Sequence, residues 1–251
     1  MKEGRIGKEY YDGSDYFDAD AQHLVKLDSP FQRYRVAKVL ELYEPGREEH
    51  VLDLGCGWGT FCWVLGHRVK KIVGLDFSRK SIDLCEARQQ GSGLGNVSFV
   101  CADARQTGLQ DESFDLVIAA DLVEHLYPRD SQVVIGEAHR LLKQGGRLSI
   151  WTPHRGHFLE MLRAKNIILK RDVTHVDYKS MHRLKSMVEA VDFHIEKSYY
   201  AESHIGLLDS IERALLTRVP LLRRRIALLA RKPGARHVGW SSGADRTRVT
   251  S

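Results

Sequence analysis

Residues 51–61, VLDLGCGWGTF, carry the pattern with the clearest chemical meaning in this chain. An apolar run ends around Asp53 and leads into Gly55, Gly57 and Gly59, after which TFCWVLGHRV has the apolar content of a helix. A glycine-rich turn between a strand and a helix lets a ligand approach the backbone closely and directs unpaired helix N–H groups toward it. The pattern therefore predicts a ligand site at this turn.

The ligand expected at this turn carries a cationic amino group and no phosphate. Dinucleotide-binding folds use G-x-G-x-x-G, whereas the three glycines here occur at every second position, which is one residue tighter. The carboxylate of Asp53 would repel a pyrophosphate, but it suits an amino group. The sequence thus indicates a nucleoside that carries an amino acid.

Acidic residues also end three later apolar runs, namely Asp76 in VGLDFS, Asp103 in CADA and Asp121 in FDLVIAAD. A carboxylate at the end of a second strand can accept hydrogen bonds from both ribose hydroxyls, which is one reading of Asp76. The other reading is a cap for a helix that starts near Ser78. Asp103, taken alone, is equally consistent with a turn residue.

Candidates for a general base follow the fifth apolar run. Imidazole has the unperturbed pKa needed to accept a proton near neutral pH. We expect His154, which comes directly after the strand end, and then His157 to act as catalytic bases; a solvated surface loop is the alternative. The spacing of the histidines matches no common zinc pattern, so no metal site is predicted. The polar group comprises His154, His157, His175, Asp177, Tyr178 and His182.

Alternating strands and helices position these residues. Such alternation predicts an α/β fold with a doubly wound, mostly parallel sheet and helices on both faces. The expected strands are residues 50–54, 70–76, 96–103, 114–121, 146–153, 193–201 and 224–232, and the expected helices are 30–44, 59–67, 79–89, 131–143, 181–193 and 206–219. Ser29 is the expected cap of the first helix, with Pro30 in its first turn.

The domain organisation follows from these elements. Residues 1–30 form an N-terminal arm, whose Tyr10, Tyr11 and Tyr16 either cover the ligand as a lid or anchor the arm. One domain spans 31–233, with an irregular insertion at 152–182 and a helical insertion at 203–222. The Gly/Ser-rich tail, 234–251, is expected to be disordered.

Composition restricts the class of protein. The 251 residues suffice for one large domain, and no apolar run approaches the roughly 20 residues that cross a bilayer. The polar N-terminal stretch and four cysteines outside any C-x-x-C pair indicate a cytoplasmic protein with reduced thiols. The net charge of +5 is concentrated between Asp209 and Arg236. That basic, amphipathic segment is either a solvated face or a peripheral contact with an anionic membrane or nucleic acid.

In their order along the chain, these motifs resemble the class I, Rossmann-like, S-adenosylmethionine-dependent methyltransferases over residues 51–152. The resemblance implies a seven-stranded sheet with an antiparallel last strand, S-adenosyl-L-methionine as cofactor, and enzymatic methyl transfer. The cofactor-binding residues that it implies are Asp53, Gly55, Cys56, Gly57, Gly59, Asp76, Phe77, Asp103, Ala104, Ala120 and Asp121.

The resemblance also implies that the insertion at 152–182 lies on the side of the methyl acceptor. The class of acceptor is narrowed by motifs that the chain lacks. Ala120-Asp121-Leu122-Val123 does not match the Asn/Asp-Pro-Pro-aromatic motif of nucleobase amine methyltransferases, and the paired-glutamate loop of arginine methyltransferases is missing. VTHVDYKSMHRLKSMVEAVDF is similar to a segment of ubiquinone-type O-methyltransferases, although that family often has Ala-Gly-Phe where this chain has Val191-Asp192-Phe193.

In-line methylation of an oxygen on a small, lipid-like or sugar acceptor is therefore expected. A non-catalytic binding module and an RNA methyltransferase that uses the basic segment are the alternatives. The oligomeric state is left open. Glu124 and His125 are interpreted as capping and packing groups, although the related cyclopropane synthases place a Glu-His pair near the reacting centre.

Overall fold

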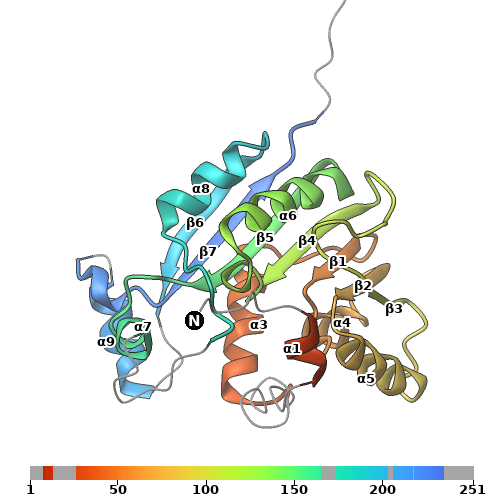
Figure 1. Cartoon of the computed structure of the whole chain (residues 1–251), viewed down its shortest axis with the longest axis horizontal. Coiled ribbons are helices and arrows are strands. Elements are labelled where there is room, and N and C mark those ends of the chain that lie inside the picture. The colour runs from red at the N-terminus through yellow and green to blue at the C-terminus, as the bar shows by residue number, and fades with distance from the viewer. Residues whose placement is uncertain (1–7, 14–26, 165–172, 203–205, 217, 235–251) are drawn as a thin grey trace, which may run out of the picture.

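The computed structural model describes residues 8–13, 27–164, 173–202, 206–216 and 218–234. Within them, seven strands form one sheet in the spatial order β3-β2-β1-β4-β5-β7-β6 (Figure 1). The strands are β1 (His50–Leu54), β2 (Lys71–Asp76), β3 (Val97–Cys101), β4 (Phe114–Ala120), β5 (Leu142–Pro153), β6 (His194–Ala201) and β7 (Arg225–Arg231).

Strand direction in this sheet matches the fold expected from the sequence. Strands β1 to β5 are parallel, and β7 pairs antiparallel with both β5 and β6. The doubly wound, mostly parallel α/β sheet and its antiparallel last strand are thus confirmed. The strand order reverses between β1 and β4, and open α/β sheets bind ligands beyond the carboxyl ends of the strands at such a point.

Helices cover both faces of the sheet and bury two separate apolar cores. Side chains of α3, α4 and α5 share one core with the strands, while α6 and α8 cover the other core. The helices are α1 (Lys8–Gly13), α3 (Pro30–Leu42), α4 (Thr60–Leu65), α5 (Arg79–Gln90), α6 (Pro128–Leu141), α7 (Phe158–Ala164), α8 (Met181–Glu189) and α9 (Gly206–Leu215), with the short 3₁₀ helices η2 (Val123–His125) and η3 (Pro220–Leu222).

Serine caps fix where three of these helices begin. The hydroxyl of Ser29 accepts a hydrogen bond from the backbone N–H of Gln32, and Pro30 follows it at the first turn, as expected. Ser78 caps α5 by accepting from the N–H of Ser81, and Ser180 caps α8. A capping hydroxyl satisfies a helix N–H that has no partner within the helix. Because Ser78 supplies this cap, the carboxylate of Asp76 is not needed to cap α5.

The buried face of α3 includes two polar residues. Gln32 and Arg35 are buried on it together with Val39 and Leu42. Arg35 donates to the side-chain oxygen of Gln32 at 3.3 Å and to the carbonyl oxygen of Ala120 at 2.8 Å. These hydrogen bonds satisfy the polar groups inside the protein, which makes their burial tolerable.

Boundaries elsewhere shift by a few residues. Helix α6 begins at Pro128 rather than at residue 131, and β5 already begins at Leu142. Proline suits the first turn of a helix, which explains the earlier start. Gly145 and Gly146 lie inside β5, where the register with β4 shifts and Gly145 has a φ of 79°.

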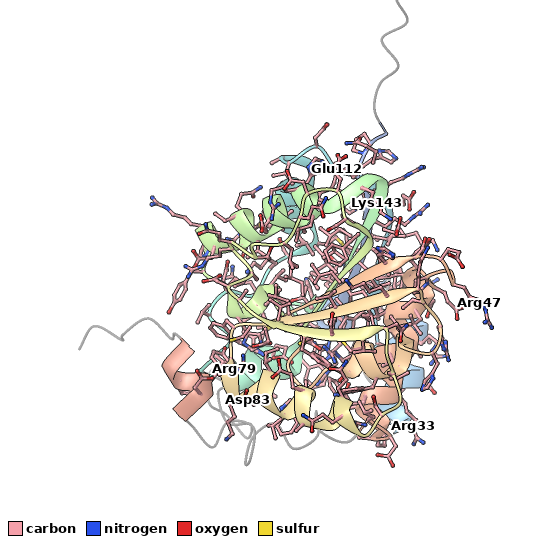
Figure 2. All side chains as sticks on the ribbon, turned by 90° about the vertical axis from the view of Figure 1, so that its right-hand side faces the viewer. Arg33, Arg47, Arg79, Asp83, Glu112 and Lys143 are labelled. Carbon is pink, nitrogen blue, oxygen red and sulfur yellow. The ribbon has the colours of Figure 1, made fainter. Side chains whose placement is uncertain are left out.

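The predicted arm, insertions and tail are described only in part. Tyr16 and residues 235–251 lie outside the described residues. None of the helices in the described ranges combines the length and the apolar character needed to cross a membrane. Charged side chains line the outer surface, as in the Arg79–Asp83 ion pair of 2.6 Å on α5 (Figure 2).

Candidate active site

The turn between β1 and α4 has three glycines in the left-handed region of backbone space. The φ angles of Gly55, Gly57 and Gly59 are 76°, 51° and 71°. A Cβ atom on Gly55 would lie 2.8 Å from Leu122 Cδ1, and one on Gly59 would lie 2.9 Å from Trp63 Nε1. A Cβ on Gly57 would meet nothing within 4 Å among the described residues. Gly57 therefore presents bare backbone to open space, where a ligand can approach it.

Asp76 lies beside this turn at the end of β2. One oxygen of its carboxylate accepts from the N–H of Gly57 and the other from the N–H of Ser78, both at 2.9 Å. A carboxylate offers about four lone-pair sites, so each oxygen can accept a further donor such as a ribose hydroxyl. Burial raises the pKa of Asp76, against the lowering effect of these backbone hydrogen bonds. Asp76 thus fits the ribose role predicted for it.

Asp53 is the most buried acid at the turn, with 2% of its surface exposed. Burial raises its pKa to about 7, while the nearby guanidinium of Arg35 opposes this rise. The thiol of Cys62 contacts its Oδ2 at 3.9 Å. A cation placed next to Asp53 would favour its ionised form. The amino group expected on the ligand would provide that cation.

Cys56 and Phe77 have structural contacts at the same place. The N–H groups of Gly55 and Cys56 both donate to the carbonyl oxygen of Leu75, at 2.7 and 2.9 Å, which fastens the turn to β2. The Cys56 thiol is buried, and burial raises its pKa. Phe77, directly after Asp76, contacts the ring of Tyr11 from α1, with ring centroids 5.1 Å apart.

Helix α1 lies over the end of β2 and the start of α5. Tyr11 is buried to 9% exposure, and Asp12 accepts from the hydroxyl of Ser78 at 2.8 Å. The Tyr11 hydroxyl also lies 3.3 Å from His125 Nδ1. Tyr11 therefore bridges the end of β2 and the η2 turn, an arrangement compatible with both roles proposed for the arm, lid and anchor.

Asp103 and Ala104 follow β3, the strand next to β2. The carboxylate of Asp103 is 41% exposed and is paired with Arg105. Its other oxygen accepts from the backbone N–H of Arg105 at 2.8 Å. Ala104 packs partly buried against the core. Both residues lie at the carboxyl edge of the sheet, as the sequence predicts, and Asp103 is tied into a local turn.

Asp121 ends β4 and holds two arginines. Its carboxylate lies 2.8 Å from Arg35 Nε and 2.5 Å from Arg225 Nη1. Its backbone has a φ of 56°, which is uncommon for a residue with a side chain, though Asp tolerates it. Burial would raise the pKa of Asp121, but Arg225 and Arg35 keep it low. The preceding Ala120 is buried and its carbonyl oxygen accepts from Arg35, so both residues are held in place at the carboxyl end of β4.

The two histidines predicted as bases lie beyond β5, and each has a hydrogen-bonding partner in another segment of the chain. His154 Nδ1 is 3.0 Å from the carbonyl oxygen of Arg223, and burial lowers the pKa of His154. His157 is fully buried, and its Nε2 is 3.1 Å from the carboxylate of Glu212 on α9. Burial is also the main cause that lowers the pKa of His157. The roles of both as catalytic bases stay predictions.

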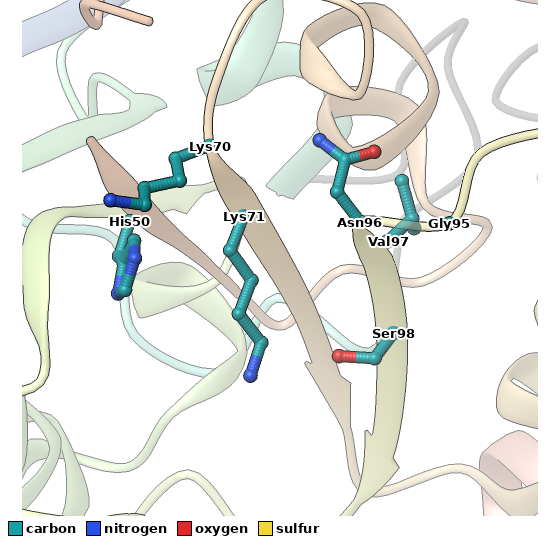
Figure 3. A pocket seen from close by; sticks show the side chains of 7 residues that line it. All are labelled: His50, Lys70, Lys71, Gly95, Asn96, Val97 and Ser98. Atoms are coloured by element: carbon teal, nitrogen blue, oxygen red, sulfur yellow. The ribbon is translucent and has the colours of Figure 1, made fainter. Parts of the chain in front are cut away.

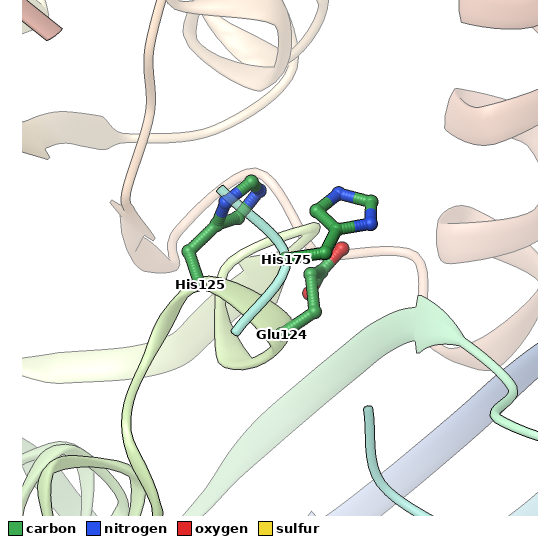
Figure 4. Close-up of side chains that lie close together, drawn as sticks. All are labelled: Glu124, His125 and His175. Carbon is green, nitrogen blue, oxygen red and sulfur yellow. The ribbon is translucent and has the colours of Figure 1, made fainter. Parts of the chain in front are cut away.

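A second polar cluster forms around η2. Glu124, His125 and His175 each offer a ligand atom, and these atoms lie within 4.8 Å of one another (Figure 4). Burial and the charge of Asp121 raise the pKa of Glu124 to about 8. The packing role expected for Glu124 and His125 does not describe this cluster fully. Local spacing could not reveal it, because His175 lies fifty residues further along the chain.

Several basic residues near the C-terminal strand form ion pairs or hydrogen bonds with other parts of the molecule. Arg225 pairs with Asp121, Lys232 with Glu112, and Arg213 with Glu202. Arg223 donates to the carbonyl oxygen of Leu216 and lies over the ring of Tyr200. Much of this positive charge is therefore neutralised or hydrogen-bonded within the described residues.

A surface hollow of about 370 Å³ occurs at the opposite end of the sheet (Figure 3). It lies at the amino ends of β1, β2 and β3, away from the edge where ligands bind in such folds. Its Asn96 side chain donates to the carbonyl oxygens of Gly66 and Val69, and Lys70 pairs with Glu48. Its polar groups serve the local structure, and no role in binding is assigned to it.

Arg35 is the residue of this site that the sequence prediction missed. It connects α3, the end of β4 and Asp121, and its guanidinium lies 5.0 Å from the Phe61 ring centroid. An arginine on the same helical face as Val39 and Leu42 was the available signal. Buried arginines in such positions are rare unless they are paired.

Comparison with known proteins places this chain in a family. A family model described as a methyltransferase domain matches residues 52–150. A malonyl-[acyl-carrier protein] O-methyltransferase of Marinomonas sp. is 30% identical over 189 residues, covering 74% of this chain and 67% of that protein. A ubiquinone biosynthesis O-methyltransferase of Coxiella burnetii is 31% identical over 107 residues, or 43% of this chain and 44% of that protein.

Other relatives differ in substrate. A 23S rRNA (uracil(1939)-C(5))-methyltransferase of Aeromonas hydrophila is 27% identical over 165 residues, covering 55% of this chain and 37% of that protein. The chain thus spans less than half the length of two of these three relatives.

The fold is shared with a solved phosphoethanolamine N-methyltransferase 2 of Haemonchus contortus in complex with S-adenosyl-L-methionine. The TM-score is 0.68 at 16% identity, over 93% of this chain and 61% of that one. In this chain the bare backbone at Gly57, the accepting carboxylate of Asp76 and the buried acid Asp53 fit such a nucleoside amino acid. The chain belongs to the class I S-adenosylmethionine-dependent methyltransferases and is an enzyme whose methyl donor is S-adenosyl-L-methionine.

Proposed function

We propose that this enzyme methylates an oxygen atom of a small or lipid-like acceptor held beyond the ends of β4 and β5. The observation that carries this proposal is the position of the segment 121–125. The side chain of its Leu122 occupies the space beside Gly55 of the donor turn, 2.8 Å from where a Cβ on Gly55 would lie, and the carbonyl oxygen of Glu124 accepts from the N–H groups of Val176 and Asp177. One short segment thus lies between the donor turn and the insertion 152–182, which we assign to the acceptor pocket.

The cofactor-binding roles follow the positions of the side chains. We assign the ribose to Asp76 and the amino group to Asp53, while Gly55, Gly57 and Gly59 supply the backbone surface for the methionine portion. Asp103 and Ala104 lie where the adenine would extend past β3. The remaining wall consists of Cys56, Phe77, Ala120 and Asp121.

Positioning supplies most of the catalysis in this proposal. S-adenosylmethionine brings a methyl group already activated by its sulfonium. The protein must hold an acceptor oxygen in line with it and exclude water, which is worth about 7–11 kcal/mol in favourable intramolecular models. His154 can accept a proton, because its Nδ1 faces a carbonyl oxygen and must carry the hydrogen, which leaves the lone pair on Nε2.

Formation of S-adenosylhomocysteine with a panel of acceptors tests the proposal. Hydroxyl- and carboxyl-bearing small molecules and lipids should support turnover, while amines and a ribosomal RNA fragment should not. Mass spectrometry of the product should place the methyl group on oxygen. Turnover confined to the RNA or to amines would refute oxygen methylation but leave the cofactor assignment intact.

His154→Gln tests the proposed base separately from folding. If Nε2 of His154 removes the acceptor proton, kcat should fall about 10²–10⁴-fold and the acid limb of the pH profile should disappear. His182→Gln, an exposed neighbour at the start of α8, is the matched control. An unchanged pH profile in His154→Gln would remove this residue from the mechanism.

A further inference from the structure

The side chains around η2 combine one carboxylate with two imidazoles. Glu124 and His125 belong to η2 after β4, and His175 comes from the insertion beyond β5. Figure 4 shows the Glu124 carboxylate and the two rings gathered on one side of the η2 turn. The rings of His125 and His175 meet edge to face, with centroids 4.8 Å apart. Carboxylates and imidazoles are common ligands of divalent transition metals.

The carboxylate of Glu124 has an unused oxygen. Glu124 is fully buried; Thr152 donates to its Oε2 at 3.0 Å, whereas Oε1 is buried without a hydrogen-bond partner among the described residues. Lys179 is nearby, but its ammonium donates to the carbonyl oxygens of Val123 and Leu126 and pairs with Asp177. A buried carboxylate oxygen without a partner is costly and points to a ligand that the protein alone does not supply.

The two imidazoles are oriented by their outer hydrogen bonds. His125 Nδ1 lies 3.1 Å from the carbonyl oxygen of Thr174, which can only accept, so this nitrogen carries the hydrogen. His175 Nδ1 lies 2.8 Å from the hydroxyl oxygen of Tyr178, and that hydroxyl donates to Glu160 at 3.1 Å. His175 Nδ1 is therefore also a donor. In both rings the lone pair is on Nε2, as in histidines that ligate metals.

We propose that Glu124, His125 and His175 bind a divalent transition-metal ion, with Zn²⁺, Mn²⁺, Co²⁺ and Fe²⁺ as the suitable class. Two neutral imidazoles and one carboxylate favour these ions over Mg²⁺ and Ca²⁺, which prefer oxygen ligands. Metal–ligand bonds of about 2.0–2.2 Å require closer spacing than the present 4.8 Å, which small side-chain rotations can supply. Three protein ligands leave coordination positions open for an acceptor.

In methyl transfer, the metal would activate the acceptor hydroxyl. This role of the metal rests on the proposed function, in which the acceptor atom is oxygen. An acceptor hydroxyl bound to the ion would have a lowered pKa and would lose its proton more readily to the proposed base, His154. The acceptor oxygen then forms the bond to the methyl carbon while the carbon–sulfur bond breaks, so that S-adenosylhomocysteine leaves. Tyr11, which touches both Phe77 and His125, places the ion close to the donor site.

Co²⁺ titration of the metal-free protein tests the site without any methyl acceptor. One equivalent should bind and give visible absorption bands, and Zn²⁺ should displace it. His175→Ala and Glu124→Gln should weaken Co²⁺ binding about a hundredfold or more, and Tyr178→Phe about 10–100-fold through loss of the orienting bond. His182→Ala, which changes an exposed histidine outside the cluster, should bind Co²⁺ like the parent.

Circular dichroism and thermal unfolding establish whether each variant is folded before it is titrated. If the parent binds no Co²⁺ or Zn²⁺ stoichiometrically, or if folded His175→Ala binds as tightly as the parent, the metal site is wrong. Metal binding without metal-dependent turnover of oxygen acceptors would retain the site and overturn only its role in transfer. If the protein binds metal but chelators leave its turnover unchanged, the metal site again stands and its role in methyl transfer is wrong.

Discussion

Burial and the charge of Arg35 act in opposite directions on the pKa of Asp53. The folded protein raises its pKa to about 7 from 3.8, chiefly by burial. Between these two pH values the folded state keeps a proton that the unfolded chain has lost. Protonation of Asp53 therefore stabilises the folded state fully below about pH 4. This stabilisation is lost as the pH rises through about 7.

Asp53→Asn should remove this contribution. In the cofactor-free protein, the slope of unfolding free energy against pH between about 5 and 7 should become less negative by up to about 1.4 kcal/mol per pH unit. Urea unfolding of both proteins at several pH values measures it, and the comparison cancels the shared effect of Glu124. Identical slopes in the two proteins would contradict a raised pKa at Asp53.

Asp76 should determine the affinity for the methyl donor. Asp76→Ala removes a charged acceptor, and the loss of about 1.5–3 kcal/mol corresponds to about 10–150-fold weaker binding of S-adenosylmethionine by calorimetry. Asp83→Ala on α5 is the matched control, because that exposed carboxylate pairs only on the surface. Equal affinity in Asp76→Ala and the parent would sink the ribose assignment.

The residues that the sequence predicted well are those whose roles depend on local order. Asp53 and Asp76 follow directly from strand, turn and helix, so their positions at the carboxyl edge could be read from the chain. Arg35 and His175 act through neighbours that are remote in sequence. Only the packing of α3 and the insertion onto β4 brings such partners together.

At the scale of elements, α7 and α9 are joined by a buried polar contact. His157, just before α7, and Glu212 on α9 are both fully buried and lie 3.1 Å apart. His157→Ala should leave Glu212 partly unsatisfied and lower the free energy of unfolding by about 1–3 kcal/mol. Urea unfolding measures the change, and His182→Ala should stay within about 0.5 kcal/mol of the parent. A stable His157→Ala protein that has lost activity would instead support the predicted catalytic role.

The contacts of helix α1 bear on cofactor binding more than on the stability of the fold. Its Tyr11 and Asp12 contact Phe77 and Ser78 next to Asp76, the proposed ribose ligand, while its six residues are too few to be a stable helix alone. Tyr11→Ala should therefore speed dissociation of S-adenosylmethionine several-fold and leave the melting temperature of the cofactor-free protein nearly unchanged. Stopped-flow dissociation separates these effects. Unchanged dissociation would favour an anchor over a lid.

At the scale of the whole molecule, the basic charge near the C-terminal strand is mostly engaged. Arg213, Arg225 and Lys232 are each paired with a carboxylate. We therefore expect only weak association with anionic vesicles or RNA, without the steep salt dependence that many free phosphate contacts produce. Vesicle flotation and RNA binding at two salt concentrations measure this. Tight, salt-sensitive binding to either would indicate a surface formed by other basic residues.

The overall fold was more predictable than the acceptor side. Apolar runs alternating with helices specify a doubly wound sheet almost by themselves, because the central strands β1, β2, β4 and β7 are largely buried between the two layers of helices. The insertion at 152–182 has no such periodicity. Its polar residues are positioned by single contacts, such as the N–H groups of Val176 and Asp177 bonded to the Glu124 carbonyl oxygen.

Strand β7 is the last of the sheet in sequence, yet it lies between β5 and β6. During synthesis on the ribosome, β6 has no partner in the sheet until β7 arrives to join it to β5. Arg225, the first residue of β7, then completes the pair of arginines around Asp121. Pairing over such long sequence separations is slow to form. A nascent chain that already contains the whole donor turn therefore lacks a finished acceptor side, and competence for methyl transfer arises only with the final strand.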